Sequence, residues 1–153
     1  MAQTVSLSEL RSCQEKAYKD ESYAKDLLGR LSADKRGDNL KAGYYGVIKA
    51  MMAEHTYNPF RKMSYFNEGK KQLEQSIKND SNSVELRFLR LGIQMNVPDF
   101  LGYKSAISKD KTFIVNHIEA QKSDLGELYN EIIDYVLELK ECSEEERAKL
   151  LNL

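Results

Sequence analysis

The chain has 153 residues and a formal net charge of −1, with 31% charged and 41% hydrophobic residues. This length suits one domain, and the composition is ordinary for a soluble globular protein. The near-neutral total gives no reason to expect nucleic acid or a membrane surface as the partner. No stretch approaches the roughly 18 apolar residues of a membrane-spanning helix. Two prolines and eight glycines leave few helix breakers.

Charge is distributed unevenly along the chain. Residues 35–78 carry nine Lys/Arg against four Asp/Glu, a net charge of +5, whereas residues 119–147 carry three against ten, a net charge of −7. Such a separation is typical of solvated helix faces. It also suits an acidic partner, or head-to-tail association between copies of the chain.

Apolar spacing predicts two short helices before residue 33. Ser6 and Glu9 have the spacing of a capping box, in which each side chain accepts a hydrogen bond from the other residue's backbone N–H. The second helix presents Tyr23 and three leucines on one side. The segment ADKRGDN, residues 33–39, then breaks the pattern at its glycine.

The third predicted helix, residues 40–55, has the stronger helical period. Its apolar side chains recur at steps of three and four, and small residues run beside them. A glycine inside a helix costs about 1 kcal/mol relative to alanine. We therefore expect a neighbouring helix to approach closely at Gly43 and Gly46, because close packing would offset that cost.

The fourth helix is expected over residues 59–78. Asn58 is suited to be its N-cap, and proline is favoured at the first helical position. Ser64 is an alternative start for this helix. The polar segment NDSNS follows, and Asn82 is expected to cap the next helix.

The fifth helix, residues 84–97, carries two apolar faces, which predicts that neighbours cover it on both sides. Only the stripe formed by Arg87, Arg90 and Gln94 is left to face water. Pro98 ends the helix, and an aromatic loop follows it.

Three further helices complete the expected fold. The sixth carries isoleucines at 107, 114 and 118, the seventh covers residues 125–139, and Ser143 with Glu146 caps an eighth that ends at Leu151. No segment alternates with a period of two, so no strand is expected. The pattern predicts an all-α fold.

Residues 65–83 have the spacing of a stacking helix-pair repeat. Gly69, Leu73, Ser76 and Ser81 follow one another at offsets of four, three and five. This rhythm resembles the second helix of a tetratricopeptide unit, although the insert TYNPFRKM lengthens the connection beyond the period of that family. The resemblance implies a single domain of antiparallel helix pairs over residues 1–153. It would be either a right-handed tetratricopeptide-like array with its core at approximately 38–121 or an irregular helical bundle.

Two longer blocks, YNPFRKMSYFNEGKKQLE and VELRFLRLGIQMNVPDFLGY…KDKTFI, resemble a bacterial family of small helical proteins that has no assigned activity. This resemblance implies a helical fold and supplies no catalytic residue. Members of such families often begin with an export signal. The start at Met1 and Ala2 therefore fits a cytoplasmic protein, or a periplasmic one whose leader has been removed.

Few residues have the chemistry of a catalytic or metal site. The chain has two histidines and two cysteines, and it lacks HExxH, GxSxG and a phosphate-binding glycine loop. His117 has no second ligand one turn away, so no metal is expected there. Cys13 and Cys142 are expected to be buried thiols, with a disulfide as the alternative in an oxidising compartment. We expect no catalytic residue and no cofactor.

Recognition of a protein or peptide is the favoured function. The exposed stripes of the third and fifth helices would form one shallow groove if those helices lie side by side. The groove residues are Lys41, Tyr45, Lys49, Arg87, Arg90 and Gln94. Arginine binds a carboxylate through two parallel hydrogen bonds, so an acidic peptide or a free chain end is the expected ligand.

Two rival interpretations belong to other functional classes. A small-molecule-binding protein or an enzyme would need an aromatic pocket near His55, Tyr57, Tyr65 and Tyr103, where a histidine beside tyrosines could perform acid–base chemistry. A self-associating structural unit would use the basic middle and the acidic tail, and high salt would weaken it. Nucleic acid is not expected, because the total charge is not basic.

Overall fold

The computed structural model describes residues 4–153, which form helices joined by short turns, with no strand among them. The predicted all-α fold class is confirmed. Met1 and Ala2, on which the choice of compartment rests, lie outside the described residues. No described helix combines the length and hydropathy that crossing a bilayer requires.

The chain falls into two compact units, Met1–Asn82 and Ser83–Leu153. Their boundary lies in the polar segment NDSNS. The first unit carries fourteen Lys/Arg against eleven Asp/Glu and the second nine against thirteen, which gives formal net charges of +3 and −4. The uneven charge of the sequence therefore follows the division into units. The single-domain expectation stays a prediction, and each unit is described by itself.

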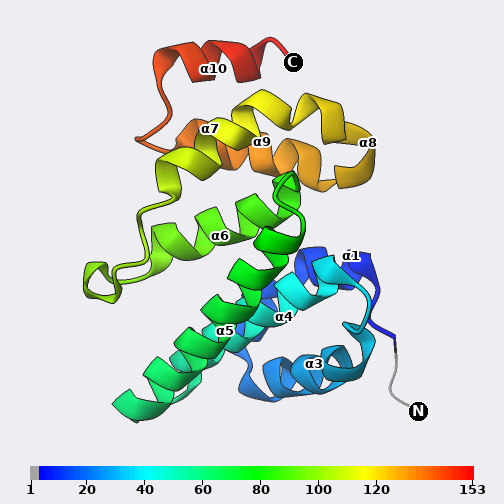
Figure 1. Ribbon diagram of the computed structural model, residues 1–153, viewed down its shortest axis with the longest axis vertical. Coiled ribbons are helices and arrows are strands. Elements are labelled where there is room, and N and C mark those ends of the chain that lie inside the picture. The colour runs from blue at the N-terminus through cyan, green and yellow to red at the C-terminus, as the bar shows by residue number, and fades with distance from the viewer. Residues whose placement is uncertain (1–3) are drawn as a thin grey trace. The chain divides into compact units, whose positions relative to one another are not determined.

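Capping side chains set most helix starts in the first unit. Its elements are α1 (Leu7–Ser12), α2 (Gln14–Lys19), α3 (Glu21–Asp34), α4 (Asn39–Met51), the 3-10 turn η1 (Met52–His55) and α5 (Pro59–Asn79) (Figure 1). Asn58 caps α5 with Pro59 at the first helical position, as predicted, so the alternative start at Ser64 is wrong. The third predicted helix is shorter than expected, because its last residues tighten into η1.

α4 and α5 lie side by side at a distance that only glycine permits (Figure 1). A Cβ atom built on Gly46 would lie 2.7 Å from the carbonyl oxygen of Gly69 and 2.8 Å from the backbone nitrogen of Leu73. One built on Gly69 would lie 2.5 Å from the nitrogen of Ala50. These distances are shorter than van der Waals contact. The close approach expected at Gly46 is confirmed, and Gly69 is its counterpart on α5.

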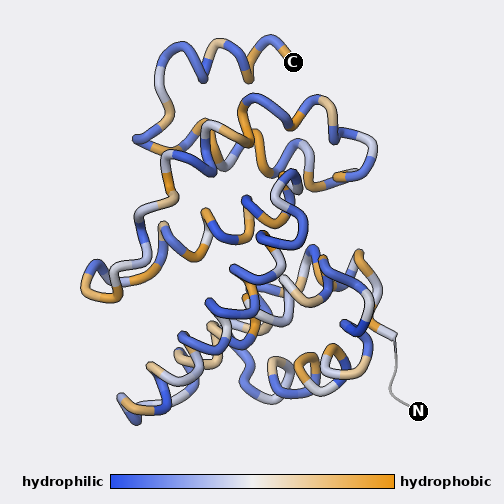
Figure 2. Tube along the Cα trace, in the orientation of Figure 1, coloured by the Kyte–Doolittle hydropathy of each residue, from blue (hydrophilic) through white to orange (hydrophobic). Residues whose placement is uncertain are grey.

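The second unit is built around one apolar cluster. Its elements are α6 (Val84–Asn96), the 3-10 turns η2 (Asp99–Leu101) and η3 (Glu119–Gln121), α7 (Ile107–His117), α8 (Lys122–Leu125), α9 (Leu128–Glu138) and α10 (Glu144–Leu151). Val84, Leu91, Ile114 and Ile132 are fully buried in this cluster. Figure 2 shows hydrophobic and hydrophilic residues alternating along the helices, as expected for amphipathic helices.

Local backbone chemistry moves two of the predicted boundaries in this unit. The N-cap of α6 is Ser83, whose hydroxyl accepts a hydrogen bond from the nitrogen of Leu86 at 3.1 Å, so the cap expected at Asn82 is wrong by one residue. The seventh helix, expected over residues 125–139, begins only at Leu128 as α9, because Gly126, with a positive φ of 54°, ends α8 at Leu125. The predicted capping box of Ser143 and Glu146 is complete.

Candidate functional site

The groove residues on α4 are already engaged within the first unit. The ammonium nitrogen of Lys41 lies 2.7 Å from a carboxylate oxygen of Asp34, and that of Lys49 lies 3.3 Å from a carboxylate oxygen of Glu68. Tyr45 is half-buried. Because both cations have an acidic partner, this stripe offers a weaker site for an acidic ligand than the sequence implied.

The groove residues on α6 do not face water, and that expectation is wrong. Arg87 and Arg90 are each 8% exposed, and Gln94 is fully buried. All three donate hydrogen bonds to Asp110 of α7, which is itself fully buried. Arg90 binds this carboxylate through Nε at 2.7 Å and Nη2 at 2.6 Å. Nη1 of Arg87 donates to Oδ1 of Asp110 at 3.2 Å, and the Arg87 guanidinium group also lies over the ring of Phe113.

This arrangement, the Asp110 cluster, joins α6 to α7. A carboxylate removed from water is costly unless opposite charges and hydrogen bonds compensate it, and two guanidinium groups with an amide supply both here. The side-chain oxygen of Gln94 also accepts a hydrogen bond from the nitrogen of Ala106 at 3.0 Å, just before α7 begins. The three side chains therefore have a structural partner inside their own unit.

The residues of the alternative pocket are divided between the two units, and the structure gives each of them its own surroundings. Nε2 of His55 lies 2.7 Å from the carbonyl oxygen of Ala17, a geometry in which the ring N–H donates to the backbone. Tyr57 is fully exposed. Tyr65 is half-buried, with the ammonium group of Lys49 5.4 Å from its ring centroid. Tyr103 is buried and belongs to the other unit.

Thiol and metal chemistry has little support in the described part of the chain. No group of three or more His, Cys, Asp or Glu residues within 4–153 is placed to hold a metal ion. Cys13 and Cys142 are both buried and free, so the disulfide alternative is not present in this structure. Burial raises the pKa of the Cys13 thiol to about 12, which suppresses the reactive thiolate.

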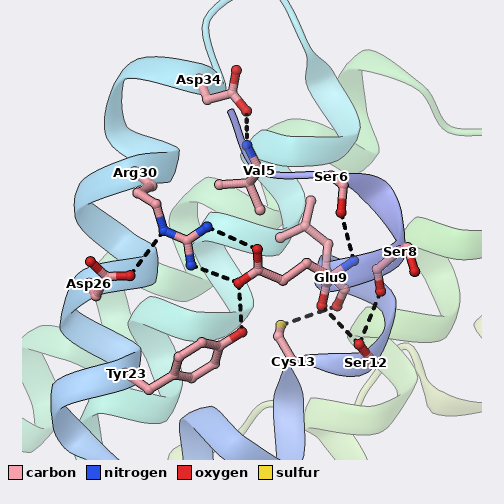
Figure 3. Close-up of polar contacts among 11 residues, drawn as sticks. Val5, Ser6, Ser8, Glu9, Ser12, Cys13, Tyr23, Asp26, Arg30 and Asp34 are labelled. Carbon is pink, nitrogen blue, oxygen red and sulfur yellow. Dashed lines mark hydrogen bonds and ion pairs between the residues drawn. The ribbon is translucent and has the colours of Figure 1, made fainter. Parts of the chain in front are cut away.

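A polar cluster around Glu9 fastens α1 to α3 (Figure 3). The Glu9 carboxylate accepts two hydrogen bonds from Arg30, at 2.9 and 2.7 Å, and one from the Tyr23 hydroxyl at 2.9 Å. The hydrogen bonds from Arg30 lower the pKa of Glu9. Burial and the bond to Glu9 raise the pKa of Tyr23 to about 12. Because the Glu9 carboxylate binds residues of α3, it does not turn back to the N-terminus of α1. Of the predicted capping box, only the hydrogen bond from the Glu9 nitrogen to the Ser6 hydroxyl is formed.

The start of α5 presents an apolar patch to solvent. We call Tyr57, Phe60 and Met63 the α5 tip; their side chains are 101%, 85% and 42% exposed. Asn58 fixes the backbone here, because its side-chain oxygen accepts hydrogen bonds from the nitrogens of Phe60, at 2.9 Å, and Arg61, at 3.3 Å. Tyr57 was predicted to be part of the alternative pocket, and Phe60 and Met63 were in neither predicted site. The sequence feature that could have indicated this patch is the run of apolar residues around the proline at the start of α5.

Two basic residues adjoin the α5 tip: Lys62 holds the helix start in place, and Arg61 adds a positive charge. The ammonium group of Lys62 donates a hydrogen bond to the carbonyl oxygen of Ala53 at 3.0 Å, which ties the first turn of α5 to η1. Arg61 is exposed, and it has no ion-pair partner within residues 4–153. The patch is therefore held on a fixed backbone with a free positive charge next to it.

No protein-family model, curated protein or solved structure matches the chain. The resemblances drawn from the sequence stay predictions.

Proposed function

We propose that the chain is a non-catalytic module that binds a protein or peptide, and that the α5 tip is its recognition site. The observation that carries the proposal is the exposure of Tyr57, Phe60 and Met63 on a capped helix start. Single exposed apolar residues are ordinary, but three neighbours on one rigid segment form a patch that gains free energy when it is covered.

The residue types of the tip suit recognition. Aromatic side chains contribute much of the binding energy in many interfaces, because they bury a large area and lose little conformational entropy. The hydrogen bonds of Asn58 and Lys62 hold the backbone of the tip in place before a partner arrives, which lowers the entropic cost of binding.

Charge favours a partner that is acidic as well as apolar. Arg61 adjoins the tip, and the first unit has a formal net charge of +3. Complementary charge speeds association and selects among partners. The expected ligand is therefore a peptide or protein segment in which leucine or an aromatic residue stands near aspartate or glutamate.

The tetratricopeptide-like architecture belongs to this proposal as well. The close packing of α4 on α5 at Gly46 and Gly69 supports a helix pair of the kind that stacks in such arrays. The α4 stripe that begins at Lys41 would then act as a secondary contact, since its cations are shared with acidic neighbours.

Peptide display gives a direct test. A random peptide library would be selected on the intact chain, and enriched peptides would be compared on two variants. Phe60→Ala removes a tip residue, whereas Phe100→Ala removes a side chain that is similarly exposed, at 82%, on the second unit. We expect acidic, apolar peptides that lose at least tenfold in affinity on Phe60→Ala and keep their affinity on Phe100→Ala, since truncating a central aromatic contact typically costs over about 1.4 kcal/mol. Equal binding to both variants, or no enrichment at all, would contradict the proposal.

A further inference from the structure

The solvent-facing side of α5 changes from apolar to basic along its length. Phe60, Met63, Asn67 and Lys71 recur at steps of three, four and four residues, so they share one face of the helix, and all four are exposed; Glu74, one step further on the same side, is half-buried. We call this set the α5 outer face. Lys71 has no ion-pair partner within residues 4–153. The face therefore offers an apolar end followed by an unpaired cation.

The solvent-facing side of α10 has the complementary order. Glu144, Ala148 and Leu151 recur at steps of four and three and are all exposed; Leu151 is 67% exposed. Glu144 has no ion-pair partner among the described residues. Glu146 differs, because its carboxylate is paired with Lys111 at 2.8 Å. We call the set formed by Glu144, Ala148 and Leu151 the α10 outer face; it is acidic at its start and apolar at its end. Arg147, three residues after Glu144, lies at its edge and is half-buried.

We propose that α10 of a second copy of this chain packs antiparallel on the α5 outer face. Leu151 of one copy would contact Phe60 and Met63 of the other, and Glu144 would lie beside Lys71. This inference rests on the proposed function, because it names a partner for the same tip. A second copy is the occupant because its second unit, with a formal net charge of −4, supplies the acidic and apolar segment that the tip requires.

The spacing along the two helices agrees with this pairing. At 1.5 Å of rise per residue, Met63 and Lys71 are separated by about 12 Å along α5, and Glu144 and Leu151 by about 10.5 Å along α10. An antiparallel arrangement thus brings both pairs together at once. It also places the negative end of the α10 dipole near the positive end of α5. A parallel arrangement would put Glu144 against the apolar tip.

Two different faces make a head-to-tail contact. Each copy offers one α5 outer face and one α10 outer face, so association continues into open chains or closes into a ring. The contact is small, and we expect it to be weak and sensitive to salt. The assembly would grow in steps of one chain, 17.6 kDa.

Two variants, each lacking one face, test the inference. Phe60→Glu removes the α5 outer face and leaves α10 intact; Leu151→Glu removes the α10 outer face and leaves α5 intact. Both positions are exposed, and circular dichroism would verify that both variants keep their helicity. Sedimentation equilibrium would follow each variant alone, their equimolar mixture, and the wild type at about 10 µM to about 1 mM, a range suited to a small interface.

We expect each variant alone to be monomeric, their mixture to form a dimer and no larger species, and the wild type to form rings or chains of two or more copies. The register has its own test by charge exchange. Lys71→Glu in the Leu151→Glu chain should weaken the mixed dimer about fivefold, and Glu144→Lys in the Phe60→Glu chain should restore it to within about twofold. Lys109→Glu, on an exposed site of α7, is the matched control and should change nothing.

Three results would overturn the inference. The equimolar mixture of the two variants could remain monomeric at every concentration tested. Alternatively, each variant could dimerise alone, which would indicate a symmetric contact. Phosphatidylglycerol vesicles could bind the wild type but not Phe60→Glu while the mixture remains monomeric, which would assign the face to an anionic membrane surface. If selected peptides still bind the tip while the mixture stays monomeric, the proposed function survives and this inference alone is lost.

Discussion

Replacing Asp110 with alanine should destabilise the second unit by about 3–5 kcal/mol, the usual cost of breaking a buried ion pair from one side. The carboxylate is fully buried and accepts hydrogen bonds from Arg87, Arg90 and Gln94 at 2.6–3.2 Å. In the variant, two guanidinium groups that are each 8% exposed would lose the buried carboxylate that both of them bind. The loss of this negative charge, and of the four hydrogen bonds that it accepts, sets the size of the effect.

Urea denaturation followed by circular dichroism would measure this change in the free energy of unfolding. Asp99→Ala is the matched control, because the Asp99 side chain is 93% exposed and its ion pair with Lys104, at 3.1 Å, is solvated. That control should cost less than about 1 kcal/mol. Asp110→Asn should also destabilise the unit, since it keeps the shape and removes the charge. If Asp110→Ala costs no more than Asp99→Ala, the Asp110 cluster does not stabilise the fold as argued.

Three other predictions concern the first unit. Gly46→Ala should destabilise this unit by about 1–3 kcal/mol, because the added Cβ would collide with the α5 backbone. Gly29→Ala on α3, where a Cβ would meet nothing within 4 Å, should stabilise the unit by about 0.5–1 kcal/mol. If thermal denaturation shows that Gly29→Ala is the less stable variant, the close packing of α4 on α5 does not have the predicted cost. The hydrogen bonds from Arg30 lower the pKa of Glu9 in the folded protein. The ionised Glu9 carboxylate therefore stabilises the fold at pH values above its ordinary pKa of 4.5, and this stabilisation is lost as the pH falls below 4.5. Glu9→Gln should therefore flatten the acid limb of the stability curve, and unchanged curves would contradict this. With its pKa raised to about 12, Cys13 should react with a disulfide reagent only on unfolding; rapid labelling of the native protein would be the opposite result.

Features fixed by neighbouring residues were predictable from the sequence. Asn58 and Pro59 start α5 because an amide oxygen and a preset φ satisfy the first helical turn locally. Gly46 indicated a close helix contact, because its cost inside a helix requires compensation. Both arguments need only a few adjacent residues, and both agree with the structure.

Features that depend on distant residues were not predictable in the same way. The stripe of Arg87 and Arg90 was expected to face water, because a charged stripe on a helix is normally solvated. In the structure both arginines bind Asp110, which lies 20 residues beyond Arg90 in another helix. A signal was present, since Asp110 falls on the apolar stripe of Ile107 and Ile114, where an acid is buried and requires cations.

The α5 tip was missed for a related reason. Periodicity assigns apolar residues to the core, and nothing local distinguishes Phe60, which is 85% exposed, from Phe66, which is 6% exposed. Exposure depends on which neighbours are present, and that is decided only when the chain folds. The candidate recognition site therefore became visible with the structure.

The central claim, that the α5 tip recognises a partner, is tested most directly by photo-crosslinking from the tip itself. A benzophenone amino acid would be placed at residue 60 in one variant and at residue 100 in another, since both phenylalanines are more than 80% exposed and lie on different units. With the best peptide from display, we predict a crosslinked product from position 60 and none from position 100. Crosslinking from position 100 alone, or equally from both, would contradict the claim.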